Sequence, residues 1–227
     1  MGKNLLILYV VLYGLELLCE HWLKISIVDY LILYPLGSSG FHLWQIITHG
    51  FIHDPGAPLS FVINCLVFYF FAAPVEQALG TKRFLTLFFI SAIGGAICGL
   101  LFSTVSGFSV PFMGMMPSLL SLIVVFGLLN PEATILLMFI LPIKAKYLSY
   151  GTVLITFLTF LAKANPHGAY HLGGMLFGYI YFKGPGNVLD PNLLYLKYLQ
   201  WQYKQKKRRF TVINKDPKRD DDKPTLH

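Results

Sequence analysis

The chain has 227 residues, of which 55% are hydrophobic and only 13% are charged, and its formal net charge is +7. Soluble domains carry about 25% charged residues, so this composition excludes an ordinary soluble globular protein. Eleven of the eighteen Lys and Arg residues lie between Lys183 and Lys223. The positive charge therefore belongs to the C-terminal tail, and it gives no reason to expect nucleic acid binding.

Long apolar segments follow one another along the chain. A helix needs roughly 20 apolar residues to cross a hydrocarbon layer about 30 Å thick, where unpaired backbone groups are excluded. We therefore expect an all-α, polytopic membrane protein with six transmembrane helices. The aromatic-rich connection between the first two spans, residues 22–57, predicts short helices at the membrane interface. The six expected spans are residues 4–21, 58–76, 83–104, 112–129, 147–163 and 167–183.

An even number of spans places both termini on the same side of the membrane. Lys and Arg residues near span ends collect on the cytoplasmic side. The side that holds the termini has sixteen of them, against Lys24 and Lys163 on the other side. Both termini are therefore expected to be cytoplasmic. The sixteen are Lys3, Lys82, Arg83, Lys144, Lys146 and the eleven tail residues.

The C-terminal tail differs in composition from the spans. A dense basic run at residues 204–209 lies beside Trp201 and Phe210. This combination is typical of a helix that lies on anionic lipid, so membrane lipids are expected partners; a solvated basic tail that only enforces topology is the alternative. We expect a six-span membrane domain at residues 1–185 and a basic cytoplasmic tail at residues 186–227, partly helical and then disordered.

Two of the expected spans carry closely spaced glycines, which let helix backbones approach each other in membranes. The last span also carries His171 near its start, where an ionisable side chain is costly and is a functional candidate. The alternative for His171 is a hydrogen bond to a neighbouring helix. The glycines are Gly94, Gly95 and Gly99 in the third span and Gly174 and Gly178 in the last.

Short motifs recur in a consistent order through these spans. They are Trp44-Gln45, Thr48-His49 and Phe51-Ile52-His53 in the first loop, Asn64-Cys65-Leu66, Pro74 to Gly80 with Arg83-Phe84, Gly94-Gly95, Pro142 to Leu148, and Ala169 to Gly178. With these motifs the chain resembles the rhomboid family of intramembrane serine proteases over nearly all of residues 42–183. The resemblance implies a six-helix rhomboid-like bundle.

The resemblance also implies a chemistry, in which a serine in a GxSx motif at the start of the fourth span attacks a substrate's transmembrane segment. The histidine of the last span is the general base. Here Met116 occupies the nucleophile position and His171 the general-base position. The family's second-span HxxxN signature, which helps hold the oxyanion, is represented by Ser60 and Asn64. A thioether cannot act as the nucleophile, so the catalytic set is degenerate.

Two nearby hydroxyls are poor substitutes for the missing serine. At about 100° per residue, Ser118 is rotated roughly 200° from Met116, and Ser121 about 140° and more than a turn deeper. We expect neither to face His171, and we expect Ser121 to serve as a small residue in helix packing. Pro117 is sterically acceptable in a first helical turn.

The sequence thus favours an inactive rhomboid, a pseudoprotease that binds transmembrane segments of unknown client proteins. The alternative is an active intramembrane serine endopeptidase with an unconventional nucleophile. A transporter or channel is disfavoured, since no inverted repeat or further intramembrane charged pair is evident. No cofactor is expected, and no metal, because no cysteine completes a ligand set with His49 and His53. The compact six-span form resembles bacterial members, so a bacterial cell membrane is the expected location.

Overall fold

The computed structural model describes residues 1–137, 141–163, 166–184 and 202. The chain divides into two compact units, Met1–Pro185 and Gly186–His227. All helices and strands given below belong to the first unit. The predicted tail helix and the predicted disordered end lie outside the described residues.

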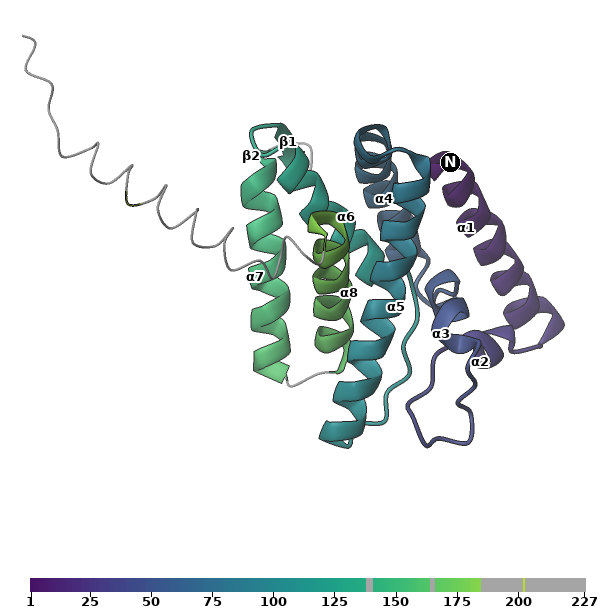
Figure 1. Cartoon of the computed structure of the whole chain (residues 1–227). Helices are drawn as coiled ribbons and strands as arrows, with labels where there is room; N and C mark the ends of the chain where they lie inside the picture. The colour runs from purple at the N-terminus through teal and green to yellow at the C-terminus, as the bar shows by residue number, and fades with distance from the viewer. Residues whose placement is uncertain (138–140, 164–165, 185–201, 203–227) are drawn as a thin grey trace, which may run out of the picture. The chain divides into compact units, whose positions relative to one another are not determined.

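Long helices dominate the first unit, and the connection after the first of them carries the short elements expected there (Figure 1). The long helices are α1 (Gly2–Leu17), which continues as the π-helical turn η1 (Leu18–Leu23), α4 (Pro58–Leu79), α5 (Thr81–Ser106), α6 (Met116–Leu129), α7 (Ala145–Lys163) and α8 (Pro166–Lys183). The short elements are α2 (Ile27–Leu31), α3 (Gln45–Thr48) and the 3-10 turn η2 (His49–Phe51).

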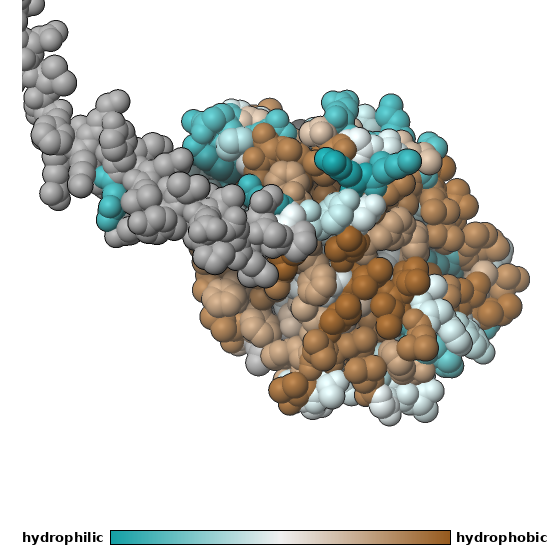
Figure 2. Space-filling view, in the orientation of Figure 1, coloured by the Kyte–Doolittle hydropathy of each residue, from teal (hydrophilic) through white to brown (hydrophobic). Residues whose placement is uncertain are grey.

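Within the described residues, four helical segments are long and apolar enough to cross a membrane: Gly2–Leu23, α4, α5 and Ala145–Ala162. Helix α6 has 14 residues and α8 has 18, and both pack among the other helices. Exposed Leu, Ile, Val and Phe side chains lie on α1, α4 and α7. Figure 2 shows hydrophobic residues over most of the visible helical face, with hydrophilic residues gathered along one edge. The prediction of an all-α polytopic membrane bundle is confirmed.

The fourth long helix begins at Met116, whereas the apolar run predicted a start at residue 112. Phe112 and Leu33 instead exchange two backbone hydrogen bonds of 2.8 and 3.0 Å. Gly114 then turns the chain with a φ of +91°, a conformation that favours glycine. Pro117 lies in the first turn of α6, as its missing N–H allows. This extended entry places Met116 at the very start of the helix.

A β-hairpin, which hydropathy did not predict, connects α6 to α7. Its strands β1 (Thr134–Leu137) and β2 (Leu141–Lys144) are antiparallel, with Thr134 opposite Lys144. Glu132 accepts hydrogen bonds from Lys144, at 2.6 Å, and from Lys146. The hairpin and these ion pairs lie at the end of the bundle that was predicted to face the cytoplasm (Figure 1).

The crossing of α5 and α8 brings two helix backbones into contact. A Cβ added to Gly173 would lie 2.8 Å from the backbone oxygen of Gly94. A Cβ added to Gly95 would lie 2.7 Å from the backbone oxygen of Tyr170. Both distances are shorter than real Cβ contacts, so glycine is required on both helices. The closely spaced glycines in the sequence are thus explained by helix packing.

Helix α6 packs into the same crossing through small residues. A Cβ on Gly174 would lie 2.8 Å from the backbone oxygen of Pro117, and one on Gly178 would lie 2.5 Å from Ser91 Oγ and 2.9 Å from Ser121 Cβ. Ser91 donates a 2.8 Å hydrogen bond to Ser121 beneath Gly178. The expected packing role of Ser121 agrees with this contact.

Gly178→Leu should destabilise the bundle because its side chain would overlap Ser91 and Ser121. Overpacking of this kind costs typically about 1–3 kcal/mol. Gly151→Leu is the matched control, because a Cβ at Gly151 of α7 meets nothing within 4 Å. Unfolding in detergent, followed by circular dichroism, measures both variants. Equal stability of the two would contradict the packing described here.

A reporter fused after residue 185 should be cytoplasmic, since the basic residues predict that side. A reporter inserted after Ser38, in the connection between α2 and α3, should lie on the opposite side. Protease protection in sealed vesicles distinguishes the two positions. Protection of both reporters, or of neither, would show that the number of spans between them is wrong, and an exchanged pattern would show that the orientation is wrong.

Candidate functional site

The segment between α2 and α3 is organised around a buried glutamine. Gln45 Oε1 accepts hydrogen bonds from the backbone N–H groups of His42, at 3.1 Å, and Tyr34, at 3.3 Å. Its Nε2 donates a 2.9 Å hydrogen bond to the Gly40 oxygen. Trp44 stacks on His42 with ring centroids 4.2 Å apart. The Trp-Gln pair therefore folds the loop onto itself and holds α3 against the bundle.

His49 connects this loop to α6 and α8. Its Nδ1 lies 2.9 Å from the Gln45 oxygen, and its own backbone oxygen accepts a 2.8 Å hydrogen bond from the Gly114 N–H. Tyr170 of α8 donates a 2.9 Å hydrogen bond to the Gly114 oxygen. Burial lowers the pKa of His49 to about 4, partly offset by its backbone hydrogen bonds. His49 is thus neutral at pH 7, and its contacts with Gln45 and Gly114 give it a structural role.

A cavity of about 140 Å³ lies between the loop before α4, the start of α4 and the start of α6. Three of the four positions that the resemblance implied are among its lining residues: Met116, Asn64 and Ser60. Gly114 also lines it, two residues before the nucleophile position. The lining is completed by His53, Asp54, Ala57, Phe61 and Met113.

His171, the general-base position, does not line this cavity. It is half-buried on α8, directly after Tyr170, the residue that hydrogen-bonds to Gly114. The start of α8 therefore lies beside the start of α6, although the lining that surrounds Met116 contains a different histidine, His53.

The two serines of α6 both have partners away from the cavity. Ser118 donates a 2.7 Å hydrogen bond to the Phe88 oxygen on α5. Ser121 accepts one from Ser91, also on α5. Both serines are buried, and neither lines the cavity. Their positions agree with the helical rotation argued from the sequence, which turned them away from Met116.

His53 and Glu16 form a buried polar contact that was not assigned to the site from the sequence. The backbone N–H of His53 donates a 3.2 Å hydrogen bond to Glu16 Oε2, and the two residues are only 5% and 3% exposed. Within the described residues, neither ring nitrogen of His53 has a hydrogen-bond partner. Its ring packs edge-on against Tyr9, Tyr13 and Phe61.

Burial lowers the pKa of His53 to about 4, so its imidazole is neutral at pH 7. The sequence signal for this contact is Glu16, a carboxylate within an apolar span, where a buried charge needs a partner in the bundle. The partner proved to be the backbone of a loop residue. The described residues contain no group of three or more His, Cys, Asp or Glu side chains placed to hold a metal ion.

Comparison with known proteins identifies the family of the chain. Residues 3–183 match the family described as Eukaryotic integral membrane protein (DUF1751). The Rhomboid-like protease 3 of Toxoplasma gondii is 31% identical over 153 residues, which are 64% of this chain and 52% of that protein. The chain thus spans about half the length of this curated relative.

The expected bacterial location is wrong, because the matching family is eukaryotic. The expectation was based on the compact six-span form, which is a property of the fold and carries no information on the organism. The match extends over almost the whole helical unit. The chain therefore belongs to this family of eukaryotic integral membrane proteins, as a multi-pass protein whose sequence is similar to that of a rhomboid-like protease.

Proposed function

We propose that this protein is a rhomboid-like membrane protein without proteolytic activity, which binds transmembrane segments of client proteins. One observation carries the proposal: Met116, which the rhomboid resemblance puts at the nucleophile position, lines the polar cavity at the start of α4 and α6. The similarity to a rhomboid-like protease supports the rhomboid-like character of the chain.

The chemical argument concerns the missing hydroxyl. Acyl transfer by a serine requires an O–H that can pass its proton to a nearby base. The Met116 thioether has no proton to give, and the hydroxyls of Ser118 and Ser121 are buried in hydrogen bonds with α5. A peptide bond that enters the cavity would therefore meet no activated nucleophile from α6.

A second candidate function, an active intramembrane endopeptidase, is favoured by one specific observation. Ser60 and His53 line the same cavity, so a hydroxyl and an imidazole are both present. The His53 ring, however, is packed among aromatic rings and has no hydrogen bond to Ser60 among the described residues. The second candidate therefore lacks the hydrogen-bonded pair that activates a serine.

Polar residues that line the cavity support client binding. Asn64 is half-buried and Ser60 is exposed on α4, a helix long and apolar enough to span the membrane. Polar side chains at such positions stabilise helix association through hydrogen bonds. A client helix that carries an amide or hydroxyl group near its outer end is the partner that fits this chemistry.

The purified protein should neither cleave a generic rhomboid substrate nor react with a serine-directed fluorophosphonate. Gel fluorescence measures the labelling, with an active rhomboid protease in the same detergent as the positive control. Met116→Ser combined with Ser60→His should introduce labelling. Adding His171→Ala or His53→Ala to that variant then identifies the base.

Labelling of the unmodified protein would overturn the proposal. Its loss in Ser60→Ala would establish the second candidate function. Its loss in Ser118→Ala or Ser121→Ala would show instead that the α6 register is wrong. Pro117 should stay unchanged in all variants, because it packs against Gly95 and Gly174.

A single-span peptide with one Asn in its outer half should bind more tightly than the same peptide with Leu. Hydrogen bonds in bilayers contribute roughly 0.6–1.7 kcal/mol, so Asn64→Leu should weaken binding of the Asn peptide about three- to eighteen-fold. Binding of the Leu peptide should not change. Energy transfer between labelled protein and peptide in liposomes measures both affinities.

Tyr69→Phe is the control variant, because Tyr69 lies on the exposed surface of α4 and does not line the cavity. Equal affinity of the unmodified protein for the two peptides would refute client recognition by the cavity. It would leave the absence of proteolysis untouched, so the two parts of the proposal can fail separately.

A further inference from the structure

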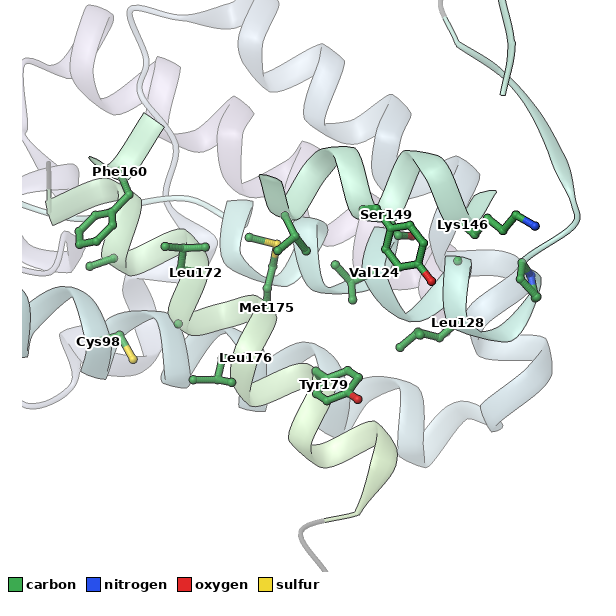
Figure 3. A pocket seen from close by; sticks show the side chains of 16 residues that line it. Cys98, Val124, Leu128, Lys146, Ser149, Phe160, Leu172, Met175, Leu176 and Tyr179 are labelled. Atoms are coloured by element: carbon green, nitrogen blue, oxygen red, sulfur yellow. The ribbon is translucent and has the colours of Figure 1, made fainter. Parts of the chain in front are cut away.

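A second and larger cavity, of about 700 Å³, lies between α6, α7 and α8 (Figure 3). Its volume falls within the range of ligand sites, which is about 300–1,000 Å³. It shares no lining residue with the polar cavity at Met116. Most of its lining is apolar, including Val124, Val153, Leu172 and Leu176. We refer to it as the α7–α8 groove.

The two ends of the α7–α8 groove differ in polarity. Figure 3 shows Lys146 and Tyr179 toward one end and Phe160 toward the other. Tyr150 also lines the groove, one turn along α7 from Lys146. Lys146 and Phe160 are fourteen residues apart on α7, which corresponds to about 21 Å of helix. The groove is thus an elongated apolar channel with a cationic end, and its shape suits an amphiphile.

The polar end of the α7–α8 groove carries a net positive charge. Lys144 and Lys146 both pair with the single carboxylate of Glu132. Their hydrogen bonds lower the pKa of Glu132 to about 2, so it is ionised at pH 7. Two positive charges and one negative charge leave one unit of positive charge at the end of the groove that Lys146 lines. That surplus is complementary to a phosphate monoanion.

We propose that the α7–α8 groove binds an anionic phospholipid, with one acyl chain along α7 and the headgroup phosphate at Lys146. The apolar lining extends along α7 between Lys146 and Phe160, so a single acyl chain can follow it while the headgroup stays at the cationic end. The expected cytoplasmic location of Lys146 matches the leaflet in which anionic lipids are concentrated.

Native mass spectrometry of the purified full-length chain tests this with phosphatidylserine and phosphatidylcholine that carry identical acyl chains. Phosphatidylserine should bind more tightly. Lys146→Gln should reduce that preference about five-fold, the effect expected of one lysine beside an anionic headgroup. Glu132→Gln should increase the preference, because it releases both lysines from their shared partner. Lys82→Gln removes the same charge at the α4–α5 junction, outside the groove, and should change nothing.

A second pair of variants tests whether the chain lies in the groove. Val153→Trp should fill the groove and displace both lipids, whereas Leu154→Trp, on a neighbouring position that does not line it, should leave binding intact. Equal affinity for the two lipids, an effect of Lys82→Gln as large as that of Lys146→Gln, or unchanged binding in Val153→Trp would each overturn the proposal.

Discussion

The crossing of α5 and α8 determines how the rest of the bundle is arranged, because two helix backbones meet there without side chains between them. The added-Cβ distances at Gly95 and Gly173 leave no room for alanine on either helix. Pro117 of α6 packs against the same surface, so the start of the short fourth helix is placed by this crossing. In a membrane, where no hydrophobic force drives helices together, such close packing supplies much of the association energy.

The cavity around Met116 follows from that arrangement. The Tyr170 hydroxyl, next to the crossing, donates a hydrogen bond to the Gly114 oxygen, and the Gly114 N–H donates one to the His49 oxygen. These two contacts hold the segment before α6 in an extended form. None of these contacts requires a serine at position 116 or a histidine at position 60. The fold can therefore keep a polar cavity while the chemistry of its lining changes, and this is the physical basis for the non-proteolytic function proposed here.

The bundle has buried or charged polar side chains in two separate places. Near the predicted outer end, His53 and Glu16 are buried, each with a side-chain atom that has no hydrogen-bond partner within the described residues, and His53 lines the cavity proposed for client helices. Near the predicted cytoplasmic end, Lys146 lines the α7–α8 groove proposed for a lipid and pairs with Glu132. The two sites share no residue, so lipid binding and client binding can be changed independently by substitution.

Hydropathy and glycine spacing by themselves determined the membrane class, the long helices and the faces on which they pack, because the bilayer allows few alternatives to apolar helices. Helical rotation alone also placed Ser118 and Ser121 away from Met116. Only the tertiary structure decided that α6 starts at Met116, that Thr134–Leu137 pairs with Leu141–Lys144, and that His53, instead of His171, lines the cavity. These features depend on contacts between segments far apart in the chain, such as Leu33 with Phe112, which local patterns do not encode.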